Sequence, residues 1–358
     1  MNYDRFASLL VNYCLDVQPK QTISVNADIV AIELVEEIYK YILISGAYPQ
    51  IDLSNSIFTE LFYEHANKDQ LEHVSPISIF KTKNIDSTIS IRSQTNTKAL
   101  SNICTDKQQK RMNALKDLNQ EISHKRWVLT LFPTTGYAQD AGMSLRDFTS
   151  FVSNALFLNK SDPVLSWKKL SENQEKYIEK IKHSEKVQIK SNEIDISFCI
   201  QNRNWINSDG KQNMPSGEIY TTPIEDSLNG YYYSSLSNSK YNKEINGVYI
   251  EFKNGNIVKI KAEKNEEYLV KLLETDEGAK TIGEFGIGLN YGINKPINNI
   301  LFDEKIGGTV HIALGQSHEK TGGKNKSGIH LDLIADLNKD SEIIFDNKIF
   351  YKNGKFVL

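Results

Sequence analysis

Apolar and polar residues alternate along the first half of the chain in patterns that predict helices and strands in turn. Apolar residues recur at helical spacing over 6–14 and 29–44, and the second stretch ends before Gly46, a residue typical of helix ends. Short apolar runs predict strands at 22–25, 48–53, 85–91 and 126–132. Further helices are expected at 144–158, where Ser144 and Asp147 have the spacing of a capping box variant, and at 163–183. This order predicts an α/β domain with an open, mostly parallel sheet and helices packed on it.

The second half is richer in strands. Runs at 248–252 and 257–260 flank Asn254-Gly255, and runs at 348–351 and 355–358 flank Asn353-Gly354, which are two hairpin signals. One helix, at 265–274, interrupts them. A length of 358 residues favours two domains. We expect an α/β N-terminal domain at 1–185 and an α+β, strand-rich C-terminal metal-binding domain at 186–358.

Composition excludes several classes of protein. A hydrophobic fraction of 39% and a charged fraction of 24% suit a globular chain, and a net charge of -3 gives no reason to expect a nucleic-acid partner. Cys14, Cys104 and Cys199 lie far apart, which suits a reducing compartment. The first residues lack the pattern of a signal peptide, and no apolar run is long enough to cross a bilayer. We therefore expect a cytoplasmic protein without a membrane partner.

Candidate chemistry gathers where His311, His318 and His330 fall within one Gly-rich, strand-rich stretch. In a strand, residues two apart share a face, so His330 and Asp332 can reach one metal site together while Leu331 faces the core. His311 likewise alternates with apolar neighbours on a predicted strand. Taken singly, each pattern also suits an ordinary half-buried strand.

Two glutamates complete the candidate set. Glu218 and Glu284 each follow a glycine and lie among apolar or small residues. A buried carboxylate needs a partner or a metal, whereas a turn glutamate in solvent needs neither. Together with His311, His330 and Asp332 they provide ligands for two divalent ions with one shared carboxylate. Oxygen and nitrogen ligands without thiolates suit Zn, Co or Mn, and such a pair of ions activates water for hydrolysis of a peptide bond.

Four segments resemble the aminopeptidase T / aminopeptidase S family of metallo-aminopeptidases in sequence, order and spacing. They are MPSGEIYTTP at 214–223, IGEFGIGLN at 282–290, DEKIGGTVHIALG at 303–315, and TGGKN from 321 through the His330-Leu331-Asp332 tripeptide. The N-terminal half is similar mainly at 137–144 and looks shorter than in other members. The resemblance implies that Glu218, Glu284, His311, His330 and Asp332 hold two metal ions. It also implies a homodimer that removes N-terminal residues from peptides with a free N-terminus.

One position departs from the family pattern. The family has a tyrosine, assigned to stabilising the tetrahedral intermediate, seven residues after the first ligand histidine, and here that residue is His318. A histidine can also donate a hydrogen bond to an oxyanion, with a pH dependence that tyrosine lacks. His318 therefore either takes this catalytic role or is a loop residue.

The resulting hypothesis is an aminopeptidase in which a water activated by two metals attacks the scissile carbonyl. Glu218 or Glu284 moves the proton to the leaving amine, and Glu304 is a weaker candidate. Two alternatives stay open at this point. One is another dinuclear-metal amidohydrolase, which cleavage of N-blocked substrates would reveal. The other is a non-catalytic metal-binding or peptide-binding descendant, motivated by His318 and the short N-terminal half.

Overall fold

The computed structural model describes residues 1–236 and 243–357. By its internal contacts the chain divides into two compact units, one formed by Met1–Ser166 with Gly210–Pro215 and the other by Trp167–Asp209 with Ser216–Leu358. The first unit thus ends inside helix α10 (Pro163–Ile181). The domain boundary at residue 185 stays a prediction.

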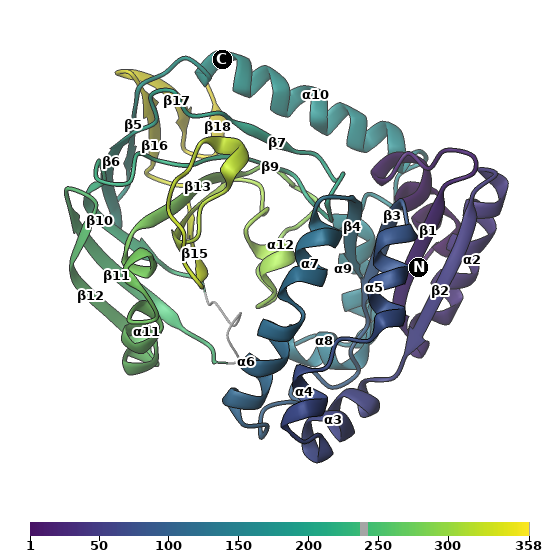
Figure 1. The fold of residues 1–358 in the computed structure, drawn as a ribbon. Coiled ribbons are helices and arrows are strands. Elements are labelled where there is room, and N and C mark those ends of the chain that lie inside the picture. Colours follow the sequence, from purple (N-terminus) through teal and green to yellow (C-terminus); the bar gives the residue numbers. More distant parts are fainter. Residues whose placement is uncertain (237–242, 358) are drawn as a thin grey trace. The chain divides into compact units, whose positions relative to one another are not determined.

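A five-stranded parallel sheet forms the centre of the first unit (Figure 1). Its strand order is β2 (Tyr48–Ser54), β1 (Thr22–Asp28), β3 (Ser87–Arg92), β4 (Arg126–Leu131) and β8 (Asn213–Met214). Ile23, Val25, Ile89 and Val128 on the middle strands are fully buried, as both faces of a covered parallel sheet require. The open, parallel α/β sheet expected from the sequence is confirmed.

Helices connect these strands. They are α1 (Tyr3–Ser8), the π-helix η1 (Leu9–Cys14), the 3₁₀-helix η2 (Ile29–Ala31), α2 (Ile32–Ile44), α3 (Ser56–His65), α4 (Lys68–Glu72), α5 (Pro76–Asn84), α6 (Thr105–Ala114), α7 (Lys116–Ser123), α8 (Thr135–Asp140) and α9 (Leu145–Ala155). The hydrophobic pattern did not indicate α3 to α8. Three of these helices, α3, α6 and α7, contain no buried residue, and α4 and α8 are only five and six residues long. Ser144 is the N-cap of α9, because its hydroxyl accepts a hydrogen bond from the N–H of Asp147, and the Asp147 carboxylate accepts a hydrogen bond from that same hydroxyl.

The second unit contains two antiparallel sheets (Figure 1). The larger has the order β12 (Asn256–Lys264), β11 (Asn246–Lys253), β10 (Asn229–Ser234), β6 (Ile194–Cys199), β5 (Lys186–Lys190), β16 (Glu342–Phe345), β17 (Lys348–Lys352) and β18 (Lys355–Phe356). The smaller has the order β15 (His330–Asp336), β14 (Thr309–Gly315), β13 (Ile282–Gly288), β9 (Glu218–Thr221) and β7 (Ile206–Ser208). The helical elements are α10, α11 (Glu266–Leu273), η3 (Glu277–Lys280), α12 (Ile300–Asp303) and η4 (Glu319–Thr321).

Both predicted hairpin turns are present. Asn254-Gly255 joins β11 to β12 and Asn353-Gly354 joins β17 to β18, and all four residues have the positive φ of a type I′ turn. The last residue of the second predicted run, 358, lies outside the described residues.

The core of the second unit lies between its two sheets. The rings of Phe198 on the larger sheet and Phe285 on the smaller one meet edge to face with centroids 5.0 Å apart. The buried hydroxyl of Tyr232 donates a hydrogen bond of 2.8 Å to the carbonyl of Leu333. These contacts fix the apolar face of the smaller sheet, so that its other face is left for polar side chains.

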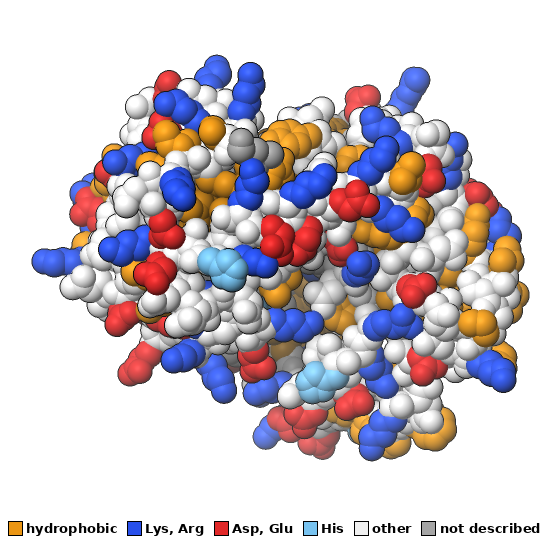
Figure 2. Space-filling view, turned by 90° about the horizontal axis from the view of Figure 1, so that it is seen from above, with side chains coloured by type: hydrophobic (Ala, Val, Ile, Leu, Met, Phe, Trp, Pro, Cys, Tyr) orange, Lys and Arg blue, Asp and Glu red, His pale blue; other side chains and the backbone are white. Residues whose placement is uncertain are grey.

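Charged side chains of both signs are interspersed over the face of the molecule seen in Figure 2, without a large field of one sign there. Among the described helices, none combines the length and hydrophobicity needed to cross a bilayer.

Candidate metal centre

Four neighbouring strands of the smaller sheet carry all five predicted ligands. In spatial order, β15 supplies His330 and Asp332, β14 His311, β13 Glu284 and β9 Glu218. The register pairs Ala313 with Asp332 and Gly286 with His311, so the five side chains belong to one face of the sheet. The alternate positions point into the core, and they include Ile219, Phe285, Ile287, Ile312, Leu331 and Leu333. Strand periodicity thus separates the polar face from the core face.

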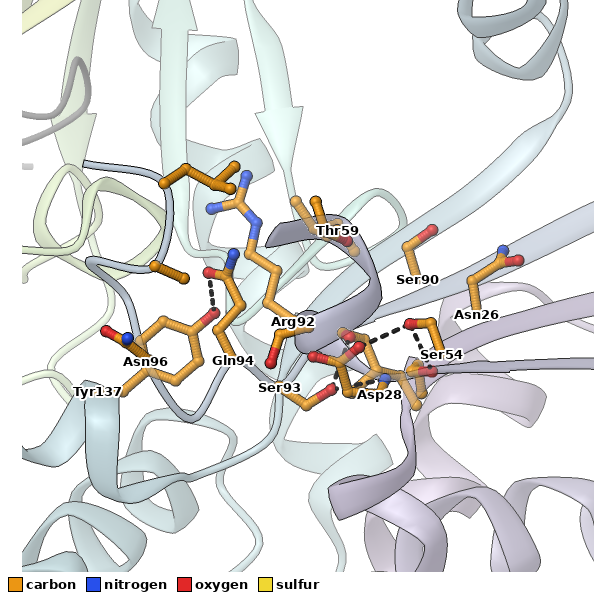
Figure 3. A pocket seen from close by; sticks show the side chains of 16 residues that line it. Asn26, Asp28, Ser54, Thr59, Ser90, Arg92, Ser93, Gln94, Asn96 and Tyr137 are labelled. Atoms are coloured by element: carbon orange, nitrogen blue, oxygen red, sulfur yellow. Dashed lines mark hydrogen bonds between the residues drawn. The ribbon is translucent and has the colours of Figure 1, made fainter. Parts of the chain in front are cut away.

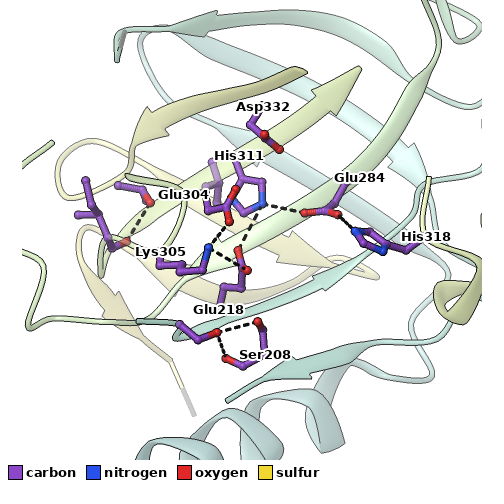
Figure 4. Close-up of polar contacts among 12 residues, drawn as sticks. Ser208, Glu218, Glu284, Glu304, Lys305, His311, His318 and Asp332 are labelled. Atoms are coloured by element: carbon purple, nitrogen blue, oxygen red, sulfur yellow. Dashed lines mark hydrogen bonds and ion pairs between the residues drawn. The ribbon is translucent and has the colours of Figure 1, made fainter. Parts of the chain in front are cut away.

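Glu284 lies at the centre of the polar face (Figure 4). Its Oε1 is 3.1 Å from Nε2 of His311, and its Oε2 is 3.3 Å from Nε2 of His318. Nε2 of His311 is also 3.6 Å from Oε2 of Glu218. Glu218, Glu284 and His311 are all buried, so these groups meet largely out of contact with water.

His330 and Asp332 form the second part of the cluster. His330 Nε2 is 2.9 Å from Asp332 Oδ1, while His330 Nδ1 lies 2.7 Å from the carbonyl oxygen of Gln316. A hydrogen bond from Nδ1–H to that carbonyl leaves the lone pair of the neutral ring on Nε2, directed at the cluster. Histidines that bind metals are held in this way by a partner on the other ring nitrogen.

The five residues form two overlapping groups with the spacing of metal sites. Glu218, Glu284 and His311 offer ligand atoms within 4.8 Å of one another, and so do Glu284, His330 and Asp332. Glu284 belongs to both groups. Glu218 Oε2 and His311 Nδ1 are buried without a hydrogen-bond partner in the described part of the chain, which a polar core tolerates poorly. The donor set and these unsatisfied atoms fit divalent cations.

Gly286 makes room for the imidazole of His311 across the sheet. A Cβ placed at Gly286 would lie 2.2 Å from both Cε1 and Nε2 of His311. The two glycines before the glutamates have the role expected of them, since a Cβ at Gly217 would lie 2.7 Å from Asn290 Cβ and one at Gly283 2.3 Å from the carbonyl oxygen of Gly315. The Gly-rich segments therefore allow close packing around the site.

His318 stands at the solvent side of the cluster, with 53% of its side chain exposed. Its backbone is fixed because the carbonyl of His318 accepts hydrogen bonds from the N–H and the hydroxyl of Thr321, and the Thr321 hydroxyl is 2.6 Å from that of Thr222. The ring of Tyr220 lies beside it, with centroids 5.1 Å apart. The structure thus places His318 against Glu284, in contact with the candidate ligands.

Sequence reasoning gave no role to Lys305 or Tyr220. The Lys305 side chain is fully buried, pairs with Glu304 and lies 3.6 Å from Glu218 Oε1 (Figure 4). Lys305 lies in the segment at 303–315 that resembles the family, but a lysine next to a glutamate in a turn usually faces solvent, so its local pattern did not indicate a buried role. Tyr220 could have been found, because it lies two residues after Glu218 on the same strand and shares its face.

Burial and neighbouring charges shift the protonation equilibria of the cluster. Burial raises the pKa of Glu218 to about 7, although Lys305 opposes this. Burial also acts to raise the pKa of Glu284, but the hydrogen bond with His311 and the nearby imidazolium charges outweigh it and that pKa is lowered. For His311, burial acts in the opposite direction, and the hydrogen bond with Glu284 together with the charge of Glu218 raises the pKa to about 9. Burial likewise opposes the charge of Lys305, but the attraction of Glu218 and Glu304 leaves the lysine pKa raised.

Comparison with known proteins gives concordant results. The chain is 24% identical over 390 residues to "Aminopeptidase 2" of Geobacillus stearothermophilus, covering 94% of this chain and 93% of that protein. It is 31% identical over 156 residues to "Aminopeptidase T" of Thermus thermophilus, covering 38% and 37% of the two chains. The solved structure titled "Wild-type AmpT from Thermus thermophilus" has the same fold, with a TM-score of 0.87, 20% identity and coverage of 100% and 99%.

The resemblance found in the sequence is therefore confirmed at the level of the family. The family model described as thermophilic metalloprotease (M29) matches residues 1–356, and the chain belongs to this family.

Proposed function

We propose that this protein is an aminopeptidase that removes N-terminal residues from peptides with the help of two divalent metal ions. Membership of a metalloprotease family implies a divalent metal cofactor and peptide substrates. The observation that carries the proposal is the pair of overlapping ligand groups that share Glu284. Relatives named aminopeptidase over nearly the whole chain support the exopeptidase assignment.

The two groups give each ion a mixed set of ligands. One ion would be held by Glu218, Glu284 and His311, and the other by Glu284, His330 and Asp332. Oxygen and imidazole donors without thiolate suit Zn, Co or Mn. When bound, the ions supply Lewis acidity that polarises a carbonyl and lowers the pKa of water.

Carboxylates of this chain are placed to move protons during hydrolysis. Glu218 and Glu284 both lie in the cluster, and either one can pass a proton to the leaving amine if one of its oxygens is free of metal. Glu304 is less suited, because one of its oxygens is paired with Lys305. The α-ammonium of the substrate must be recognised by a negative group, which this carboxylate-rich site provides.

His318 is the donor that we assign to the developing oxyanion. Its side chain is 53% exposed to solvent, and its Nε2 is 3.3 Å from Oε2 of Glu284 in the cluster. Tyr220 packs against its ring and steadies it. A hydrogen-bond donor held in this position stabilises the negative charge on the oxygen of the tetrahedral intermediate. Removing such a donor lowers kcat by about 10²–10³-fold in other hydrolases.

Hydrolysis of leucine p-nitroanilide tests the proposal. We expect turnover that a chelator abolishes and that Zn, Co or Mn restores, with no cleavage of the N-acetylated substrate. Glu284→Gln should abolish turnover and lower metal content at both sites, whereas Glu193→Gln, at an exposed position, serves as the matched control. Undiminished turnover in Glu284→Gln, or cleavage of the blocked substrate, would refute the aminopeptidase assignment.

Metal analysis separates ligands from proton carriers. Wild-type protein should hold two ions per chain, and Glu218→Gln should lose one of them if Glu218 is a ligand. A variant that keeps both ions and loses turnover identifies the proton carrier instead. Full activity with one ion per chain contradicts the dinuclear proposal.

A cytoplasmic location and a homodimer are also proposed. The three cysteines are free thiols, which suits a reducing compartment. The homodimer follows from the family resemblance, and light scattering of the purified protein measures it directly.

A further inference from the structure

A cavity of about 580 Å³ lies at the carboxyl ends of the parallel strands in the first unit (Figure 3). Its wall includes the ends of β1, β2 and β3, with residues such as Asp28, Ser54 and Arg92. In the strand order β2-β1-β3-β4, the chain runs from β1 to β2 on one side and then crosses to β3 on the other side of β1, so the direction of winding reverses at β1. Ligands of open α/β sheets bind at such switch points, so the cavity stands where this fold forms binding sites. It is built entirely from residues of the first unit.

Two opposite charges face this cavity. Arg92 is exposed at the end of β3, and within the described residues its guanidinium makes neither a hydrogen bond nor an ion pair. Asp28 ends β1, and its carboxylate accepts a hydrogen bond of 2.6 Å from the hydroxyl of Ser54. A carboxylate that accepts one hydrogen bond keeps further acceptor capacity for a ligand. Among the described lining residues, the charged side chains are therefore one free cation and one acceptor anion.

The other described lining residues carry no charge, and several of the polar ones are held in place. Tyr137 donates a hydrogen bond of 3.1 Å to Gln94 Oε1, and burial raises the pKa of Tyr137 to about 12, so it adds no charge near neutrality. The loop that carries Gln94 packs against α8, where a Cβ at Gly136 would lie 2.5 Å from the carbonyl oxygen of Thr95. Ser93 fixes the neighbouring end of β1 by accepting a hydrogen bond from the N–H of Asp28. Preformed walls with few charges are typical of small-ligand sites.

We propose that this cavity binds a zwitterionic ligand, a free α-amino acid or a short peptide, with its carboxylate on Arg92 and its ammonium on Asp28. A single cation and a single anion in one cavity match a ligand of no net charge that carries both charges. A guanidinium is suited to a carboxylate because it can donate two parallel hydrogen bonds. The volume lies within the range of sites for small molecules. Since amino acids are what an aminopeptidase releases, the further step of calling this a product site rests on the proposed function.

Calorimetric titration of the full-length, chelator-treated protein tests the proposal without turnover. The probes are L-leucine, Leu-Gly-Gly, leucinamide, which lacks the carboxylate, and N-acetyl-leucine, which lacks the ammonium. We expect saturable binding of leucine or Leu-Gly-Gly with a dissociation constant on the order of 1 mM or below. Leucinamide and N-acetyl-leucine should bind at least about tenfold more weakly, because each loses a charged hydrogen-bond partner. The two binding arms distinguish a free amino acid from a peptide as the ligand.

Substitutions locate the binding. Arg92→Gln and Asp28→Asn should each weaken leucine or peptide binding by about tenfold or more. Lys98→Gln removes a charge from a side chain that is 65% exposed and does not line the cavity, so it should leave binding unchanged. Circular dichroism and thermal unfolding confirm that each variant is folded.

Three outcomes overturn the inference: absence of saturable heat from leucine and from Leu-Gly-Gly, equal binding of leucinamide, or wild-type binding by folded Arg92→Gln. Because no metal or turnover is involved, these outcomes leave the hydrolysis test of the proposed function untouched. Conversely, a protein without peptidase activity can still bind the zwitterion here.

Discussion

Gly286 offers the sharpest test of how the sheet builds the metal centre. Its Cβ-free backbone faces His311, and an added methyl group would lie 2.2 Å from two atoms of the imidazole. Carbon atoms in contact keep about 3.5–4.0 Å, so in Gly286→Ala the ring must move by more than about 1 Å. The backbone of Gly286 has no positive φ, so the substitution acts on the ring and leaves the strand conformation unstrained.

The size of the effect follows from the tolerance of metal bonds. Ligand distances vary by only about 0.2 Å around their ideal values, and a misplacement of about 1 Å in an active site can cost about 10²-fold in rate. Nε2 of His311 also holds Glu284 at 3.1 Å, so moving the ring disturbs the carboxylate shared by both ligand groups. We expect Gly286→Ala to bind less metal and to lose about 10²-fold in kcat/KM.

The assay compares Gly286→Ala with Gly328→Ala. Gly328 also lies in the second unit, two residues before His330, but a Cβ there meets nothing closer than 3.5 Å. Both variants are measured for metal content by mass spectrometry and for hydrolysis of leucine p-nitroanilide. Thermal unfolding of the metal-free proteins shows whether either variant has lost its fold.

Only one pattern agrees with the reasoning: Gly328→Ala matches wild type, and Gly286→Ala is folded but poor in metal and activity. Equal metal content and equal turnover in the two variants would show that metal binding does not depend on the position of the His311 ring over Gly286. The assignment of His311 as a ligand would then be wrong.

Three further predictions concern neighbouring residues. His318→Tyr, which introduces the residue that the family resemblance implies at this position, should keep activity. His318→Phe should lower kcat by about 10²–10³ with a smaller change in KM, which steady-state kinetics measures. Lys305→Met should lower the free energy of unfolding of the metal-free protein by about 3–5 kcal/mol, because the buried Glu218 and the half-buried Glu304 lose their cation. Urea denaturation measures this, and an unchanged midpoint would contradict it. Ile312→Ala, on the core face beside His311, should cost about 2–5 kcal/mol in the same measurement while the folded enzyme keeps its kcat.

Periodicity alone was enough to separate the two faces of the strands that carry the candidate histidine ligands. In β15 and β14, apolar residues alternate with His330, Asp332 and His311, and the structure buries the apolar set between the sheets. A period of two fixes which side chains share a face, whatever strand lies next to them. The hairpins at Asn254-Gly255 and Asn353-Gly354 could also be predicted from the sequence, because their turn type requires residues that tolerate positive φ.

The order of the strands in the sheet could not be predicted from the local pattern of apolar and polar residues. That β13 lies between β14 and β9 depends on long-range pairing, so nothing near Glu284 indicated that it would be the carboxylate common to both groups. The fit of His311 over Gly286 depends on the same register. Spacing along the chain could suggest candidate ligands, but it could not divide them between the two candidate groups.

Lys305 shows why some residues of such a site cannot be predicted from the local sequence. A cluster that buries Glu218, Glu284 and Asp332 places three carboxylates in a medium where each isolated charge costs several kcal/mol. In the chain without metal, cations of its own offset the charge of these carboxylates. His311 and the fully buried Lys305 supply them. Because that requirement arises only once the carboxylates have converged, it belongs to the assembled site and leaves no local signature around residue 305.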